Sequence, residues 1–137
     1  MIRDPHREDS LKDLVARTSG LQSARRILHA MTGTLIFLAI TLLELSTSLT
    51  IPALSVIFFV LLAFDTIRLR VPRVNVLFFR FFQILVSPRE SQNIASSTWY
   101  ILGALIAIAL FPISAALSGI LVLAWADPTA SYLGRRW

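Results

Sequence analysis

Four long apolar segments constrain the fold of this chain more than any other feature of its sequence. They cover residues 32–49, 51–69, 94–111 and 112–131. A membrane-spanning helix needs about 20 mostly apolar residues; the first and third segments qualify directly, and the others qualify if Asp65 and Asp127 lie within or at the inner edge of the span. A soluble domain of 137 residues, 55% of them hydrophobic and only 15% charged, could not bury so much apolar surface. We therefore predict an all-α fold, a polytopic membrane helix bundle with four transmembrane helices.

Positive charge is confined to one side of these segments. Of the 13 Lys and Arg residues, six precede the first segment, five lie between the second and third, and two follow the fourth. By the positive-inside rule, both termini and the long connection face the cytoplasm. Residues 1–30 are expected to form a cytoplasmic lead-in, too charged at its start for a signal peptide. The predicted location is the inner membrane of a bacterium, or the endoplasmic reticulum or plastid membrane of a eukaryote.

The long connection contains a shorter apolar stretch, 74–86, with the sequence VNVLFFRFFQILV. Its length of about 13 residues is too short for a span and suits an interfacial amphipathic helix. At about 100° per residue, the phenylalanines cover most of the helix and the polar residues fall on one side. Those polar residues are Arg73, Asn75, Arg80, Gln83 and Ser87. We expect this helix to lie along the cytoplasmic membrane surface.

Charge and residue usage limit the chemistry. The net charge of +5 comes from juxtamembrane residues, which favours contact with anionic lipid headgroups or phosphates over nucleic acid, so no nucleic-acid partner is expected. The absence of cysteine excludes disulfides and thiol catalysis, and two histidines are too few for a histidine-rich metal cage. The sequence contains no P-loop, GxGxxG motif or serine-hydrolase elbow.

Two acids lie at the inner ends of segments that run in the same direction. Asp65 and Asp127 are each followed closely by Thr and then Arg, in DTIRLR and DPTASYLGRR. Ionisable groups inside spans are energetically costly and are functional candidates by default. Two carboxylates at similar depth would hold Mg²⁺ or another divalent cation, whose shell is completed by water and substrate phosphates. Nearby arginines would hold the phosphate oxygens.

Structural explanations for these two acids stay open. Asp65 could pair with Arg68 or Arg70 and merely end a span. Asp127 could cap a following turn that begins at Pro128. Neither alternative needs a ligand.

Several other candidate residues can also be explained without a functional role. His29 alone fits an interfacial histidine, and Arg89 with Glu90 fits a solvated ion pair. Glu44 lies near the outer interface and receives no role. Three glycines are more typical of helix packing than of a phosphate loop: Gly33, Gly103 and Gly119.

Four motifs, in order, carry a resemblance to a known family. They are ARRILHAMTG, FDTIRLRVPRVN, SPRESQNIASSTWYILG and WADPTASYLGRR, and together they cover about residues 25–136. In sequence and order they resemble the dolichol kinase, phytol kinase and CTP-dependent diacylglycerol kinase family of integral membrane enzymes. That family is similar to the phosphatidate cytidylyltransferases in the Asp-centred segment. The resemblance implies phosphoryl transfer from CTP to a lipid alcohol.

The motif matches also imply roles for individual residues. Asp65, Asp127 and His29 would be catalytic, with His29 or a carboxylate accepting the alcohol proton. Asp65, Asp127 and Glu90 would hold the metal. The implied nucleotide or phosphate contacts are Arg26, Arg68, Asn75, Arg89, Ser131, Gly134 and Arg135. Gly33 and Ala130 complete the first and fourth motifs.

The sequence departs from the family after DPTASYLGR. Family members continue with another glycine, a basic Thr-rich stretch with a Gly-Ser pair and further spans, so we expect a truncated member, a fragment or a degenerate paralogue. Three functions remain as hypotheses: a CTP-dependent lipid kinase, favoured by DTIRLRVPRVN; a cytidylyltransferase that makes a CDP-lipid; and a non-catalytic membrane protein that binds a lipid or partner. Assembly into a homo-oligomer is also left open.

Overall fold

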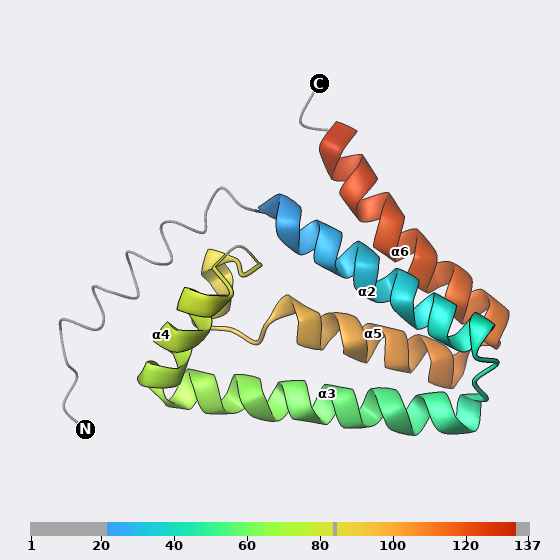
Figure 1. Cartoon of the computed structure of the whole chain (residues 1–137), viewed down its shortest axis with the longest axis horizontal. Helices are drawn as coiled ribbons and strands as arrows, with labels where there is room; N and C mark the ends of the chain where they lie inside the picture. Colours follow the sequence, from blue (N-terminus) through green and yellow to red (C-terminus); the bar gives the residue numbers. More distant parts are fainter. Residues whose placement is uncertain (1–21, 84, 134–137) are drawn as a thin grey trace.

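The computed structural model describes residues 22–83 and 85–133, and this part of the chain is helical and contains no strand (Figure 1). Its elements are α2 Gln22–Leu42, α3 Thr47–Arg70, α4 Pro72–Phe81, the short 3₁₀ helix η1 Pro88–Ser91, α5 Ser96–Leu110 and α6 Ile113–Leu133. The predicted all-α fold is confirmed. Most of the predicted lead-in, 1–21, and the last residues, 134–137, lie outside the described residues.

Three of the described helices are long and apolar enough to cross a membrane, judged by length and composition. The qualifying windows are Ala24–Leu42, Thr47–Arg70 and Ile113–Ala130. The predicted third span, 94–111, corresponds to α5, which is apolar but has 15 residues. At 1.5 Å per residue it rises about 22 Å, less than the ~30 Å of a hydrocarbon core. One of the four predicted spans is therefore shorter than a full crossing.

The four apolar helices form two antiparallel pairs, α2 with α6 and α3 with α5, and α5 also packs on α6 (Figure 1). A buried apolar cluster joins all four helices at the end where α2 turns into α3. Its members are Ile40, Leu54, Ala104, Ile108, Ala116, Leu117 and Ile120. The opposite end holds α4, η1 and the buried polar groups described below, so the apolar core and the polar site are separated along the bundle axis.

Large apolar side chains also cover the outside of the bundle. On α3, Val56 and Phe59 are each 63% exposed and Val60 is 62% exposed. A water-soluble surface would carry polar residues at such positions, whereas lipid tails solvate them without penalty. The outer surface of α3 therefore fits the membrane class that the composition indicates.

The turn between α2 and α3 lies earlier than the sequence suggests. α2 ends at Leu42, and Glu44 follows in the left-handed region with φ 50°. The N–H of Leu45 donates to the carbonyl of Ile40 at 3.1 Å, which is the long-range bond of a Schellman motif. The predicted segment 32–49 therefore does not coincide with one helix, because α2 covers Gln22–Leu42 and residues from Thr47 onward belong to α3.

A helix is present where the interfacial helix was predicted, with different bounds and a different placement of its polar residues; its location at the membrane surface stays a prediction. α4 covers Pro72–Phe81 in place of 74–86. Its polar residues do not share one side: Asn75 is buried, whereas Arg73 and Arg80 are exposed. The predicted polar side is therefore wrong, because the Asn75 amide faces the polar groups of the bundle and not water.

Gly33 brings three helices close together. A Cβ atom placed on it would lie 2.7 Å from the Cβ of Ala124 on α6 and would also overlap the hydroxyl of Tyr100 on α5. The packing role expected for this glycine is confirmed. A Cβ on Gly103 or Gly119 would meet no atom within 4 Å, so neither glycine is needed for packing among the described residues.

Candidate functional site

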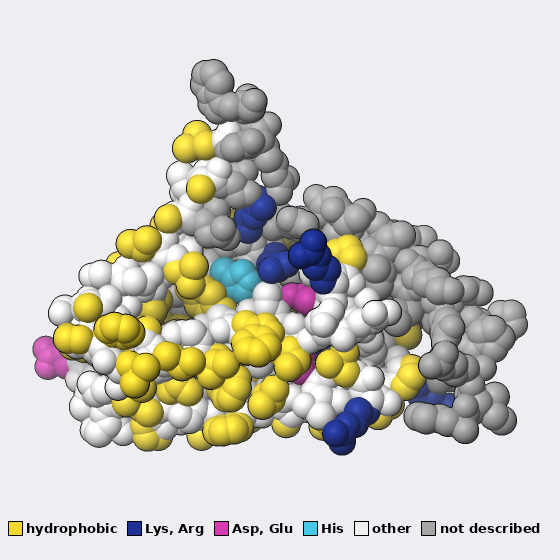
Figure 2. Space-filling model, turned by 180° about the vertical axis from the view of Figure 1, so that it is seen from behind, with side chains coloured by type: hydrophobic (Ala, Val, Ile, Leu, Met, Phe, Trp, Pro, Cys, Tyr) yellow, Lys and Arg dark blue, Asp and Glu magenta, His cyan; other side chains and the backbone are white. Residues whose placement is uncertain are grey.

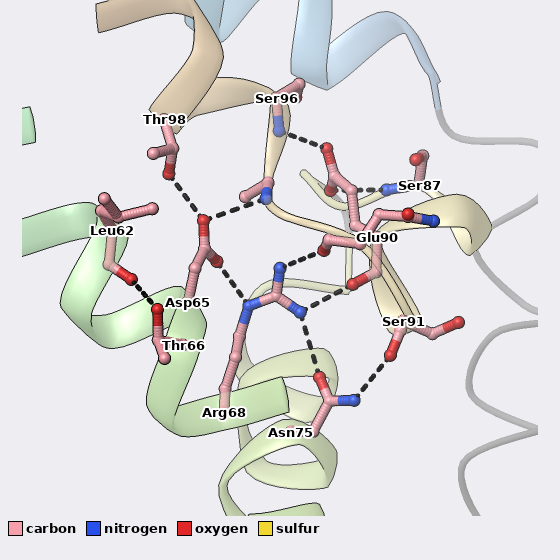
Figure 3. Close-up of polar contacts among 12 residues, drawn as sticks. Leu62, Asp65, Thr66, Arg68, Asn75, Ser87, Glu90, Ser91, Ser96 and Thr98 are labelled. Atoms are coloured by element: carbon pink, nitrogen blue, oxygen red, sulfur yellow. Dashed lines mark hydrogen bonds and ion pairs between the residues drawn. The ribbon is translucent and has the colours of Figure 1, made fainter. Parts of the chain in front are cut away.

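A buried arginine organises the polar end of the bundle. The Arg68 side chain is 0% exposed and lies at the C-terminal end of α3. Its guanidinium donates to Asp65 Oδ1 at 2.6 Å, to Asn75 Oδ1 at 3.2 Å, and to the backbone carbonyls of Glu90 and Asn93 at 2.6 and 2.8 Å (Figure 3). The ring of Phe78 lies 4.6 Å from the guanidinium carbon, within cation–π range. One side chain thus joins α3, α4 and the loop after η1.

Asp65 uses both of its oxygens in the same cluster. Oδ1 pairs with Arg68, while Oδ2 accepts the N–H of Ala95 at 3.0 Å and the hydroxyl of Thr98 at 2.6 Å. The carboxylate is 2% exposed. Burying a charge is costly unless it is paired and hydrogen-bonded, and three donors with one positive charge meet that condition here. The alternative in which Asp65 pairs with Arg68 is what the structure contains.

Glu90, on η1, bonds to backbone N–H groups at both ends of the connection between α4 and α5. Its Oε2 accepts the N–H of Ser87 at 3.1 Å, and its Oε1 accepts the N–H of Ser96 at 2.8 Å. Glu90 is 5% exposed, so the alternative of a solvated Arg89–Glu90 pair does not hold for this carboxylate. Together, Asp65 and Glu90 satisfy two backbone donors at the start of α5, where the helix macrodipole also favours negative charge.

Asn75 ties α4 to η1. Its amide oxygen accepts from Arg68, and its amide nitrogen donates to the carbonyl of Ser91 at 2.8 Å. A sharp corner brings α4 into this position: Val71 is the last residue before α4, and Pro72 occupies the first turn, where its missing N–H costs little. The sequence DTIRLRVPRVN therefore folds as a helix end, a proline corner and a returning amide that meet at one guanidinium.

A groove of about 750 Å³ opens beside this cluster. It is lined by Arg25 from α2, by Ser87, Arg89 and Glu90 around η1, and by Ser96 and Trp99 from α5, among others. No hydrogen bond or ion pair joins the guanidinium of Arg25 or Arg89 to another side chain in the described part of the chain. In Figure 2, Lys and Arg side chains gather next to an acidic and a histidine side chain, above a broad hydrophobic surface. The groove therefore presents two available positive charges.

His29 lies next to the groove without lining it. Its Nε2 is 3.3 Å from Ser96 Oγ, and its ring stacks on Tyr100 with centroids 5.0 Å apart. Since Ser96 lines the groove, the histidine reaches the groove through one hydroxyl.

The structure describes only some of the other residues that were predicted to form the site. Arg26 is on α2 and half-buried, and Arg89 is exposed. Asp127 lies within α6, which continues through Pro128 to Leu133, so Asp127 does not cap a new turn. The side chains of Asp127 and Ser131 lie outside what the structure describes, as do Gly134 and Arg135 in their entirety.

The predicted metal site of Asp65, Asp127 and Glu90 stays a prediction, because the Asp127 side chain lies outside what the structure describes. No group of three or more His, Asp or Glu side chains among residues 22–83 and 85–133 is arranged to hold an ion. A carboxylate offers about four lone-pair positions; Asp65 uses three of them and Glu90 uses two. Most of the bonding capacity of Asp65 and about half of that of Glu90 is used within the protein, and Mg²⁺ stays a prediction that depends on Asp127.

Several residues of the cluster were not singled out from the sequence. They are Arg25, Asn93, Ser96 and Thr98. The signal that could have found Thr98 and Ser96 is the run ASST before an apolar helix, because Ser and Thr side chains and the first N–H groups of a helix attract carboxylates. Asn93 contributes only a carbonyl, which a side-chain pattern does not reveal.

Fold and site together define a class: an all-helical bundle of membrane-spanning character with a buried, charge-paired corner beside an open basic groove. Over 74 residues the chain is 34% identical to CTP-dependent diacylglycerol kinase 1 of Eremothecium gossypii, and the match covers 54% of this chain. It is 31% identical over 80 residues to the enzyme of that name in Saccharomyces cerevisiae, and 31% over 87 residues to that of Schizosaccharomyces pombe, covering 58% and 64% of this chain. The resemblance indicated by the four motifs is confirmed.

The similarity to these kinases is partial in both directions. The matches span 23%, 28% and 40% of the three relatives' own lengths. No protein-family model matches the chain. No solved structure matches it either.

Proposed function

We propose that this chain is a membrane-embedded, CTP-dependent lipid kinase whose acceptor is a diacylglycerol. The observation that carries the proposal is the groove that places Arg25 and Arg89, whose guanidinium groups bond to no other side chain among the described residues, beside the corner held by Arg68. The name of the three relatives supports both CTP and the acceptor class. In this arrangement the polar end of the bundle faces the cytoplasm, where the nucleotide is.

The proposed reaction moves one phosphoryl group. The bond between the β,γ-bridging oxygen and the γ-phosphorus of CTP breaks, a bond from the lipid hydroxyl oxygen to that phosphorus forms, and CDP leaves. Catalysis of this kind depends mainly on positioning and on neutralising phosphate charge. Arg89 and Arg25 are available for the charge, whereas Arg68 is fully used within the protein and acts by holding the groove in shape.

The hydroxyl proton needs an acceptor, and His29 is the best-placed candidate. Asp65 is buried with its oxygens engaged, which leaves it inaccessible to substrate. Ser96 Oγ lies in the groove wall and 3.3 Å from His29 Nε2, so a proton could pass from the lipid hydroxyl through Ser96 to the imidazole. Mg²⁺, when bound with the nucleotide, would supply further charge neutralisation, and Asp127 is its proposed protein ligand.

The test uses membranes that contain the full chain, CTP labelled on the γ-phosphate, Mg²⁺ and separate lipid alcohols: a diacylglycerol, dolichol and phytol. The expected result is a labelled diacylglycerol phosphate. His29→Gln should lower kcat by about 10²- to 10⁴-fold, the usual contribution of general acid–base catalysis. Arg70→Gln, which changes an exposed arginine that does not line the groove, is the matched control.

Two results would count against the kinase. If the chain makes no more lipid phosphate than an Asp127→Asn variant does, it has no lipid kinase activity. A CDP-lipid with release of pyrophosphate, in place of CDP and a lipid phosphate, would assign the chain to the cytidylyltransferase reaction.

A further inference from the structure

Packing determines which side of α4 faces outward. On its inner side, Asn75 bonds to Arg68 and to the carbonyl of Ser91. The Phe79 ring on the same side is 0% exposed. Turning α4 about its axis would break these contacts, so its opposite side, here called the outer face, stays exposed. Side chains spaced by four, seven and eight residues share this face of the helix. They are Arg73, Leu77, Arg80 and Phe81.

The outer face of α4 has a basic edge and an apolar edge. With 3.6 residues per turn, Arg73 and Arg80 lie within about 20° of each other around the helix. Leu77 and Phe81 lie about 40° and 80° further round from Arg73. Leu77 is 52% exposed and Phe81 is 75% exposed. Two arginines therefore border two large apolar side chains that the protein itself does not cover.

In the described part of the chain, nothing neutralises the two arginines of the outer face. The sequence contains no acidic residue between Asp65 and Glu90. Both of those carboxylates are buried and bonded inside the protein. No hydrogen bond or ion pair joins Arg73 or Arg80 to another side chain among residues 22–83 and 85–133. Uncompensated positive charge beside exposed apolar groups is the combination with which amphipathic helices bind anionic membrane surfaces.

The position of α4 matches the level of a membrane surface. α3 has 24 residues and rises about 36 Å, more than the ~30 Å of a hydrocarbon core, so its last turn reaches the headgroups. α4 begins directly after the corner at Val71. In Figure 1 it runs across the end of the bundle and not along α3. With α3 crossing the membrane, α4 therefore lies along its surface.

We propose that the outer face of α4 is a docking surface for the anionic phospholipid headgroups of the cytoplasmic leaflet. Arg73 and Arg80 bind the headgroups, and Leu77 and Phe81 enter the adjoining acyl chains. None of these four side chains lines the groove, so the surface is distinct from the proposed phosphoryl-transfer site. Docking requires the proposed embedding of the bundle in a membrane and does not require the kinase reaction.

The test compares two lipids at one reporter position. The full chain carries Phe81→Trp, and its own tryptophans, Trp99, Trp125 and Trp137, are replaced by phenylalanine. It is placed in phosphatidylcholine nanodiscs that contain a minor share of either phosphatidylserine or phosphatidylcholine with brominated acyl chains, which quench nearby tryptophan. Stronger quenching by the brominated phosphatidylserine is expected. Added salt should weaken this preference, because it screens exposed charges.

Replacing the two arginines should remove the preference. Each basic residue near an anionic membrane surface strengthens binding by about fivefold, so Arg73→Gln or Arg80→Gln should lower the relative affinity for phosphatidylserine by about that factor. The double glutamine variant should be quenched equally by the two lipids. Arg73→Lys with Arg80→Lys keeps both charges and should retain most of the preference.

A second reporter position is the matched control. Phe59→Trp, in the same background, reports from the middle of α3, where Phe59 is 63% exposed and far from the basic edge in sequence. The two brominated lipids should quench it equally. Unchanged quenching of this reporter in the double glutamine variant shows that the bundle remains embedded.

Three results would overturn the proposal. Equal quenching by the two lipids in the Phe81→Trp protein would mean that the outer face meets lipid without selecting a charge. Quenching by neither lipid would mean that protein or water covers the face. A preference that survives the loss of both arginines would assign it to other basic residues. Because no CTP, diacylglycerol or turnover is involved, a chain without kinase activity would leave the docking surface standing, and equal quenching would leave the kinase standing.

Discussion

Asp65 on α3 and Glu90 on η1 cap the same end of α5 from two sides: Asp65 accepts the N–H of Ala95 at 3.0 Å, and Glu90 accepts the N–H of the next residue, Ser96, at 2.8 Å. The two acids are 25 residues apart in sequence, and Arg68 joins them by pairing with the first and bonding to the carbonyl of the second. The start of α5, and with it the groove wall at Ser96 and Trp99, is therefore held by charges inside the protein.

The first prediction concerns Arg68. Arg68→Lys keeps the charge but removes the planar fork that reaches Asn75 and two carbonyls, so the free energy of unfolding should fall by at least about 2 kcal/mol. Arg68→Ala should cost more, about 3–5 kcal/mol, because it leaves the Asp65 carboxylate buried without a counter-charge. Thermal unfolding of the purified protein in detergent measures both.

Arg70→Lys is the control for Arg68. Arg70 is exposed two residues further along α3, and its conservative replacement should change stability by no more than about 0.5 kcal/mol. Equal effects at the two positions would contradict the organising role of Arg68.

A second prediction concerns the contact of Gly33 with Tyr100 and Ala124. Gly33→Ala should destabilise the α2–α6 pair by about 1–3 kcal/mol, because its Cβ overlaps atoms of both neighbouring helices. Tyr100→Phe should be neutral or stabilising, since the Tyr100 hydroxyl is buried and has no hydrogen-bond partner among the described residues.

The double variant separates these causes. Gly33→Ala with Tyr100→Phe should recover part of the loss, because only the 2.7 Å approach to Ala124 remains. Gly119→Ala, free of contacts, should show no loss. A double variant no more stable than Gly33→Ala alone would contradict the overlap with the Tyr100 hydroxyl.

The helices were largely predictable because apolar run length determines them. The predicted spans 94–111 and 112–131 agree closely with α5 and α6. The boundary between α2 and α3 was placed too late, since Leu42, Leu43 and Leu45 keep the segment partly apolar across the turn, and the polar residues Glu44 and Ser46 to Ser48 were read as part of the span. What ends α2 is the left-handed backbone at Glu44, a position usually occupied by glycine.

The buried cluster was predictable in part of its membership and not in its arrangement. The motif DTIRLRVPRVN identified Asp65, Arg68 and Asn75, and their spacing by three and seven residues made the Asp65–Arg68 pair one of the open alternatives. The sequence cannot show that residues 87–96 return to the end of α3, because that return depends on backbone carbonyls and N–H groups. Asp65 and Glu90 were predicted as metal ligands, and the sequence could not show that each also accepts hydrogen bonds from the protein's own backbone.

A third prediction follows from the Glu44 backbone. A residue with a Cβ in the left-handed region is strained by about 1–2 kcal/mol, and glycine is not. Glu44→Gly should therefore raise the free energy of unfolding by about 0.5–1 kcal/mol after the greater entropy of glycine in the unfolded chain is subtracted. Glu44→Ala keeps the strain and is the control. A similar loss of stability in both Glu44→Gly and Glu44→Ala would show that the carboxylate, and not the backbone, matters at this turn.

The last prediction tests the orientation in the membrane. The chain has no cysteine, so a single introduced cysteine reports its own accessibility without background. Ser48 is exposed at the α2–α3 end of the bundle, and Gln92 is exposed beside η1 at the opposite end (Figure 1). In intact cells a membrane-impermeant maleimide should label Ser48→Cys and should label Gln92→Cys only after permeabilisation, because the basic connection between α3 and α5 is expected inside. The reverse pattern would place the basic groove on the outer face, away from CTP, and would contradict both the orientation and the proposed kinase.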